Sequence, residues 1–243
     1  MKTFLKVAIL PALLLALASA AYANSIEIGS YGTNANGTGY TASGLANTAL
    51  QYQGFTTVLS TVGPSAVGAS YDVLPGTTWA GPLWGTSWVS NSPGGGPPNG
   101  DSGDAAVGYY YFSTTFTVPV GEQWGTISVL GDDTAEILLN GVVIVNFASL
   151  NGDAHCAQGG NGPTCGYFGD NAMNDAWTVP ITALAGTNTL EIIDWQSDAS
   201  TPAGVDFSGS LSTPEPTSLL LLGTGLLGMA VILLRKSRAA VRP

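Results

Sequence analysis

The side chains best suited to binding a metal ion are acidic and lie in two clusters. Asp132, Asp133 and Glu136 surround one predicted turn, and Asp170 and Asp175 follow further along the chain. Calcium takes six to eight hard oxygen ligands, and carboxylates supply them. We therefore predict a structural calcium site at Asp132, Asp133, Asp170 and Asp175. The alternative is that these residues are solvated turn residues whose side-chain oxygens accept hydrogen bonds from backbone N–H groups.

The adjacent carboxylates of Asp132 and Asp133 do not form a catalytic pair. Glycosidases use two carboxylates that face one substrate, whereas adjacent residues on an extended chain point to opposite faces. Local spacing places no other acid beside them. We therefore predict no catalytic residue, and a protein that is not an enzyme.

Cys156 and Cys165 are the only cysteines. An even number of cysteines in an exported chain favours a disulfide between them. Closing a loop of about ten residues would stabilise the fold by roughly 2 to 3 kcal/mol in the chain-entropy account. His155 precedes Cys156, but with a single histidine and no further soft ligand the sequence does not predict a zinc site.

Three of the six tryptophans lie in a segment rich in glycine and proline, where exposure is conceivable. They are Trp79, Trp84 and Trp88. They could bind a carbohydrate, because exposed aromatic rings stack on the faces of sugars. These three residues are the candidate ligand-binding residues. The alternative for most of the tryptophans is packing in the core, since one tryptophan buries roughly 200 Å².

All lysines and arginines lie in the two ends of the chain. None occurs between Asn24 and Thr213, whereas every acidic residue except Glu215 lies in that stretch. The body of the protein is therefore a polyanion that can form no lysine or arginine salt bridge. Nucleic acid is excluded as a partner, because phosphate binding depends on basic side chains.

The amino-terminal end has the pattern of a secretory signal peptide. A basic start is followed by an apolar run and then by Ala21-Tyr22-Ala23. Small residues at the last and third-last positions fit signal peptidase, which predicts cleavage between Ala23 and Asn24. Residues 1–23 are therefore predicted to direct export and to be removed.

The carboxy-terminal end, residues 214–243, has three parts. Pro214-Glu215-Pro216 is followed by the apolar segment 217–234 and by a basic tail, 235–243, that begins with Arg235. A helix over 217–234 would reach roughly 27 Å, close to the thickness of about 30 Å of a hydrocarbon core. The sequence predicts a transmembrane helix whose basic tail stays in the cytoplasm.

These three parts resemble the PEP-CTERM sorting signal of Gram-negative bacteria that produce exopolysaccharide. The resemblance implies recognition by an exosortase at Pro214, Glu215 and Pro216, with the helix as a transient anchor in the inner membrane. It implies a protein of the cell envelope, the outer surface or the extracellular matrix. An ordinary single-pass anchor is the alternative, since hydropathy does not distinguish a permanent anchor from a cleaved one.

The body, residues 24–213, has the size of one all-β domain. Strands are predicted where aromatic and β-branched residues crowd together, and Asn140-Gly141 between apolar runs predicts a type I′ hairpin turn. The clearest strands are 111–118, 126–130, 135–139, 142–145, 189–195 and 205–211, and weaker ones are 25–28, 49–52 and 56–59. Residues 91–104, rich in glycine and proline, are predicted to be a flexible loop.

The second half of the body resembles the galactose-binding-like jelly roll. The shared features are Asp132-Asp133, Leu139-Asn140-Gly141, the run from Gly186 to Leu190, and Pro202-Ala203-Gly204 before the last strand. The resemblance implies an all-β jelly-roll sandwich. We expect an exosortase-sorted protein with a structural or adhesive role, with exopolysaccharide as a partner. The alternative is a carbohydrate-binding module that recognises an extracellular glycan.

Overall fold

The computed structural model describes residues 25–32, 44–60, 68–97, 105–119, 123–149, 161–166, 175–212 and 223–230. The chain divides into one compact unit, Ser25–Ser212, and a second that comprises Met1–Asn24 and Thr213–Pro243. The predicted signal peptide, its cleavage point at Ala23 and Asn24, Pro214-Glu215-Pro216 and Arg235 lie outside the described residues.

In the second unit the structure describes one helix, over residues 223–230. It lies inside the predicted membrane span of 217–234. Within the described residues, no helix has both the length and the apolar character needed to cross a bilayer. The transmembrane helix therefore stays a prediction.

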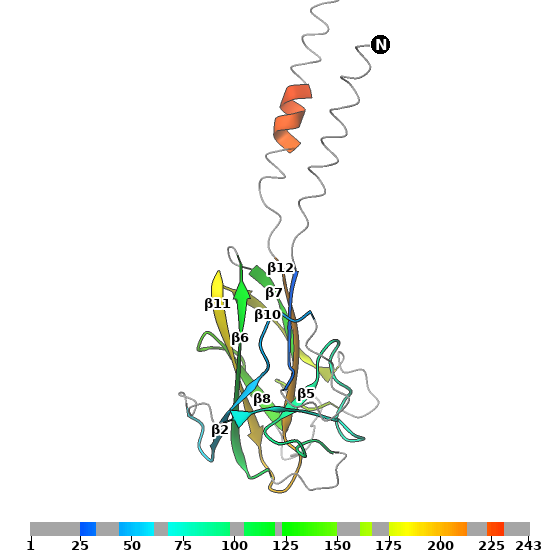
Figure 1. The fold of residues 1–243 in the computed structure, drawn as a ribbon, viewed down its shortest axis with the longest axis vertical. Helices are drawn as coiled ribbons and strands as arrows, with labels where there is room; N and C mark the ends of the chain where they lie inside the picture. Colours follow the sequence, from blue (N-terminus) through cyan, green and yellow to red (C-terminus); the bar gives the residue numbers. More distant parts are fainter. Residues whose placement is uncertain are drawn as a thin grey trace, which may run out of the picture. The chain divides into compact units, whose positions relative to one another are not determined.

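The body is a sandwich of two antiparallel sheets, as predicted (Figure 1). The first sheet contains β1 (Ser25–Gly29), β4 (Tyr71–Val73), β5 (Trp88–Ser90), β7 (Gln123–Asp132), β10 (Trp177–Ala183) and β12 (Gly204–Ser212). The second sheet contains β2 (Gln51–Thr56), β3 (Gly68–Ala69), β6 (Gly108–Val118), β8 (Thr134–Leu139), β9 (Val142–Val145) and β11 (Gly186–Gln196).

Long central strands organise each sheet. The first sheet has the order β10-β7-β12-β5-β4, with β1 also paired to β12, and the second has the order β3-β2-β6-β11-β8-β9. The chain changes sheets between β7 and β8, where Asp132-Asp133-Thr134 connects them. This crossing places two acidic residues between the sheets at one end of the sandwich.

Alternation along the strands builds the main core. In β6, Phe112, Phe116 and Val118 point inward and are buried, while Thr115 and Thr117 point outward and are exposed. The largest fully buried side chains of the cluster between the sheets are Ile28, Leu50, Phe112, Phe116, Ile127, Ile137, Leu190 and Phe207. All lie within Ser25–Ser212, so this unit carries its own core.

The predicted hairpin turn between β8 and β9 is confirmed. Asn140 has φ of 53° and Gly141 has φ of 76°, the positive values that a type I′ turn needs. Asn140 also ties the hairpin to β11, since its side-chain oxygen accepts a hydrogen bond of 2.9 Å from the Thr189 amide.

A second, smaller core covers the other face of the first sheet. Trp79, Trp88 and Leu130 are buried together there, and the rings of Trp79 and Trp88 lie 4.4 Å apart. Leu130 follows the inward-facing Val129 on β7 and therefore points out of the main core. The connection between β4 and β5 thus forms a hydrophobic cover over the sheet.

The loop predicted to be flexible, residues 91–104, is in part a packed element. Gly95 and Gly96 are buried, and the Gly95 carbonyl accepts a hydrogen bond of 3.2 Å from the Ala203 amide. A Cβ on Gly96 would lie 2.5 Å from the Leu74 carbonyl oxygen, so glycine is required for this close approach. The composition indicated flexibility, whereas over 91–97 the glycines permit close packing. Residues 98–104 lie outside the described residues.

The second core predicts that two neighbouring tryptophans differ sharply in their effect on stability. Trp88 is 0% exposed and Trp84 is 81% exposed. We expect Trp88→Ala to lower the free energy of unfolding by about 3 to 5 kcal/mol, because it opens a cavity. Trp84→Ala should change it by less than about 0.5 kcal/mol. Urea unfolding of the fragment 24–213 measures both, and equal losses would contradict the assignment.

Candidate functional site

Asp132 and Asp133 lie buried at the crossing between β7 and β8, joined by a cis peptide bond. Asp132 Oδ2 accepts a hydrogen bond of 2.7 Å from Trp79 Nε1. Asp133 Oδ2 accepts hydrogen bonds from the Ser197 amide at 2.8 Å and from its hydroxyl at 2.6 Å. These aspartates accept hydrogen bonds as turn residues do, but they are not solvated.

A third buried carboxylate, Asp194 on β11, belongs to the same region. It is 0% exposed on the inner face of the second sheet and pairs in register with Ala135 of β8. Neither of its oxygens has a hydrogen-bond partner within the described part of the chain. Sequence reasoning missed Asp194, because nothing local links a residue of β11 to the β7–β8 crossing.

The electrostatics of this cluster favour protonated carboxyl groups. Burial raises the pKa of Asp194 well above its usual value, and the charges of Asp132 and Asp133 raise it further. Burial also raises the pKa of Asp132, as does Asp133, while the hydrogen bond from Trp79 opposes the rise. No lysine or arginine exists in the body to compensate these charges.

The predicted calcium ligands do not form a metal site among the described residues. Within them, no group of three or more His, Cys, Asp or Glu side chains is arranged to hold a metal ion. Glu136 alternates with the inward-facing Ala135 and Ile137, so it points to the outer face of the second sheet. Asp175 lies just before β10, and Asp170 is outside the described residues. The calcium site stays a prediction.

Cys165 lies over the end of β7. It is buried in the second core and disulfide-bonded, and its carbonyl accepts a hydrogen bond of 3.1 Å from the Ala80 amide. The neighbouring Thr164 carbonyl accepts one of 3.2 Å from Gly131. Cys156, the other cysteine of the sequence, is outside the described residues, so its pairing with Cys165 stays a prediction.

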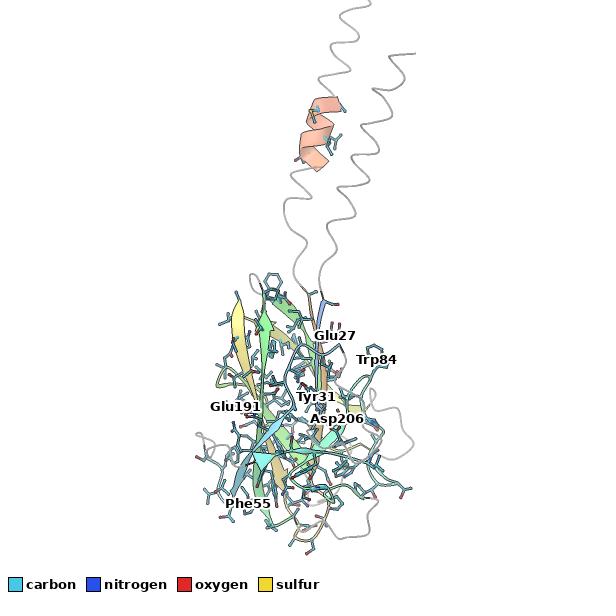
Figure 2. All side chains as sticks on the ribbon, in the orientation of Figure 1. Glu27, Tyr31, Phe55, Trp84, Glu191 and Asp206 are labelled. Atoms are coloured by element: carbon cyan, nitrogen blue, oxygen red, sulfur yellow. The ribbon has the colours of Figure 1, made fainter. Side chains whose placement is uncertain are left out.

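The prediction of ligand binding is wrong for two of the three candidate tryptophans. Trp79 and Trp88 are both 0% exposed, and their indole N–H groups donate to Asp132 and to the Ala80 carbonyl. Neither can stack on a ligand. The glycines and prolines of this segment fold it back over the sheet, which buries the two indoles. Trp84 remains, and it points outward from the molecule (Figure 2).

The turn that carries Trp84 is fixed by a buried carboxylate beneath it. Asp206 on β12 is 0% exposed, and its Oδ2 accepts a hydrogen bond of 2.7 Å from the Leu83 amide. Its Oδ1 accepts hydrogen bonds of 2.7 Å from the hydroxyls of Thr86 and Ser30. Gly85, with φ of 78°, supplies the left-handed residue of the turn. The residues before and after Trp84 are therefore anchored to β12.

Neutral donors hold Asp206 in place of a basic partner. Burial raises the pKa of Asp206, and the hydrogen bonds from Ser30, Thr86, Leu83 and Phe207 oppose that rise. Charge-assisted hydrogen bonds of this kind are about twice as strong as neutral ones. The turn therefore presents one exposed indole on a rigid support.

Comparison with known proteins identifies the carboxy-terminal end. Residues 212–237 match the model of the PEP-CTERM protein-sorting motif. A motif of this kind implies processing by an exosortase and export to the cell envelope or surface of a Gram-negative bacterium. No curated protein matches the chain.

Carbohydrate-binding modules are among the solved structures that the chain matches. A family 35 module from Clostridium thermocellum shares 12% identity at a TM-score of 0.30, covering 71% of this chain and 95% of its own. A family 35 module from an environmental isolate shares 14% sequence identity at a TM-score of 0.29, and the match covers 69% of this chain and 90% of the module. A Bacteroides fragilis protein described as a putative beta-galactosidase shares 10% sequence identity at a TM-score of 0.30, and the match covers 67% of this chain and 22% of that protein. At these TM-scores the likeness carries no inference about a ligand.

The raised pKa of Asp194 predicts that stability falls as the pH rises. Above the usual carboxyl pKa of about 4 the folded state binds more protons than the unfolded state, so unfolding becomes easier toward neutral pH. Asp194→Asn should raise the free energy of unfolding at pH 7 by about 1 to 3 kcal/mol and flatten its pH dependence. Thermal unfolding between pH 4 and 8 measures this.

Glu27→Gln is the matched control for this prediction, because Glu27 is partly exposed and can still accept its hydrogen bond from Ser210 as glutamine. It should leave the pH profile unchanged. A lower midpoint for Asp194→Asn at pH 7, reproduced in the unchanged protein by a chelator, would show that the cluster holds a cation in place of protons.

Proposed function

We propose that the exported domain is a non-catalytic glycan-binding protein with an adhesive role at the cell surface or in the exopolysaccharide matrix. The observation that carries this proposal is the exposure of Trp84, at 81%, on a turn anchored by Asp206. The sorting motif supports the location, because it directs the chain toward the cell surface.

Trp84 has the properties of a stacking platform for a sugar ring. Its indole offers a large flat apolar surface that gains free energy when a ligand covers it. Binding costs conformational entropy when the residues that contact the ligand become ordered. This cost is small for the Trp84 turn, because hydrogen bonds already fix it to β12. A rigid exposed tryptophan can therefore bind a flat partner without rearrangement.

Charge narrows the ligand of Trp84 to neutral polysaccharides. The body has no lysine or arginine that could pair with a uronate or a sulfate. An anionic polymer would meet repulsion from the acidic body. A neutral hexose polymer presents apolar ring faces to the indole and meets no such barrier.

The absence of catalysis is part of the proposal. The aspartates at the β7–β8 crossing and beneath the Trp84 turn are buried, at 4% exposure or less. A catalytic acid must reach its substrate. These carboxyl groups serve the fold, and we expect no release of reducing sugar from any polysaccharide that binds.

Affinity electrophoresis of the fragment 24–213 tests the proposal. Gels that contain a soluble β-glucan, galactan or mannan should retard the protein, and Trp84→Ala should weaken the interaction at least about tenfold. Trp124→Ala is the matched control, because Trp124 is also exposed, at 51%, and pairs with Ser212, whereas the Trp84 carbonyl accepts a hydrogen bond from Ser208 elsewhere on β12. Equal retardation of both variants, or no retardation in any gel, would contradict the proposal.

The sorting motif makes a separate prediction about processing. Replacing Pro214, Glu215 and Pro216 by alanine should leave the chain at full length in the membrane fraction of an exosortase-containing host. Ser212→Ala lies at the edge of the motif and should be processed normally. Mass spectrometry of the carboxy-terminal peptide measures the outcome. Normal processing of the triple variant would show that Pro-Glu-Pro is not the recognition element.

A further inference from the structure

A groove lies on the outer face of the second sheet, away from the main core. It has a volume of about 170 Å³ and is open to solvent. Its floor and walls come from β6, β8, β9, β11 and the segment after β2. The lining residues are Leu59, Ser60, Tyr111, Glu136, Leu138, Gly141, Val143, Glu191 and Ile193.

Strand register places two carboxylates on this face. Glu136 of β8 lies opposite Ile193 of β11, and Glu191 lies opposite Leu138. The two glutamates are therefore diagonal neighbours, with Cβ atoms about 7 Å apart. Both can reach a single group bound between them.

Neither glutamate is neutralised by a residue that the structure describes. No hydrogen bond to either carboxylate is formed within the described part of the chain, and the body contains no lysine or arginine. Burial raises the pKa of Glu136, because it removes part of the water around the charged carboxylate. A cationic ligand would relieve this cost, and an anionic one would increase it.

One wall of the groove is fixed in advance. The Ser60 amide donates a hydrogen bond of 2.8 Å to Tyr111 Oη, and the Tyr111 hydroxyl donates one of 3.2 Å to the Ser60 carbonyl. Tyr111 is itself buried in the sheet, so the segment after β2 is held against β6. A ligand that enters here does not have to order this wall.

The remaining surface suits a sugar ring. Leu59, Leu138, Val143 and Ile193 contribute apolar contacts around the two carboxylates. Trp195 follows Ile193 by two residues on β11 and therefore lies on the same outer face. It packs against Tyr109 of β6, with ring centroids 4.4 Å apart. Apolar and aromatic surface next to a few polar groups is the usual composition of a saccharide or small-molecule site.

We propose that this groove binds an amino-sugar residue of an extracellular polysaccharide, with the protonated amine held by Glu136 and Glu191. The site goes beyond the proposed function, because it lies on the sheet opposite to Trp84 and does not use that residue. Figure 2 places Glu191 and Trp84 on opposite sides of the sandwich. One domain can then hold two glycan chains at once.

Calorimetric titration of the fragment 24–213 with a fully deacetylated glucosamine tetramer tests this site at about pH 6 and 0.15 M salt, where screening weakens diffuse attraction. Glu136→Gln combined with Glu191→Gln should weaken binding at least about tenfold. The control is Glu27→Gln combined with Asp198→Asn, which changes the net charge equally outside the groove and should weaken binding less than about twofold.

A second variant keeps the test independent of the two glutamates. Val143 lies at the rim of the groove with 42% exposure, so Val143→Lys should fold and should repel the amine. The N-acetylated tetramer and a galacturonate tetramer should both bind at least about tenfold more weakly than the deacetylated one.

Three results would overturn the proposal. Equal weakening by the two double variants would show diffuse charge attraction, and equal binding of the N-acetylated tetramer would exclude the amine as the recognised group. Competition by tetralysine as strong as that by the glucosamine tetramer would show a simple cation patch. Trp84→Ala should leave this binding intact, so failure at the groove and failure of neutral-glycan binding at Trp84 are separate results.

Discussion

The absence of any lysine or arginine side chain between residues 24 and 213 is the constraint on which this structure depends. Each carboxylate has to be hydrated, protonated, or held by neutral donors. Asp206 takes the last course, with two hydroxyls and a backbone amide around it. Asp194 has no such donors among the described residues, and burial raises its pKa well above its usual value, which favours the protonated form. A buried charge without a partner costs free energy. Hydrogen bonds from neutral donors lower this cost at Asp206, and protonation would remove it at Asp194.

The same constraint links the fold to its surfaces. Asp206 and its donors form the support of Trp84, so the exposed indole depends on a buried acid. On the other sheet, Glu136 and Glu191 line a groove, and neither carboxylate has a hydrogen-bond partner among the described residues. A domain that binds glycan on both faces would connect polymer chains, and simultaneous binding raises the overall affinity without new contacts. Such bridging fits an adhesive role in a matrix.

Much of the fold could be predicted from the sequence, because its longest strands have a local signature. Aromatic and β-branched residues marked β6, β7 and β11, and Asn140-Gly141 marked the hairpin. Strand β10 was missed, since Pro180 interrupts its pattern. Its position at the edge of the first sheet explains why proline is tolerated.

The candidate site was less predictable, because it depends on contacts between distant segments. Asp132 and Asp133 were found from their spacing, whereas Asp194 joins them only through the pairing of β8 with β11. The three tryptophans at 79, 84 and 88 have similar local composition, and only the fold of the β4–β5 connection separates two buried rings from one exposed ring. The pairing of Glu136 and Glu191 likewise follows from strand register.

A two-step binding experiment by surface plasmon resonance tests most directly whether the two faces of the domain bind two ligands at once. The fragment 24–213 is first captured on an immobilised neutral polysaccharide that retards it in gels, and a deacetylated glucosamine oligomer is then passed over the surface. The account predicts that the captured protein binds the oligomer with the affinity of the free protein and without release from the surface. Displacement of the protein by the oligomer, or loss of oligomer binding on capture, would show that the two ligands share one site and would contradict the account.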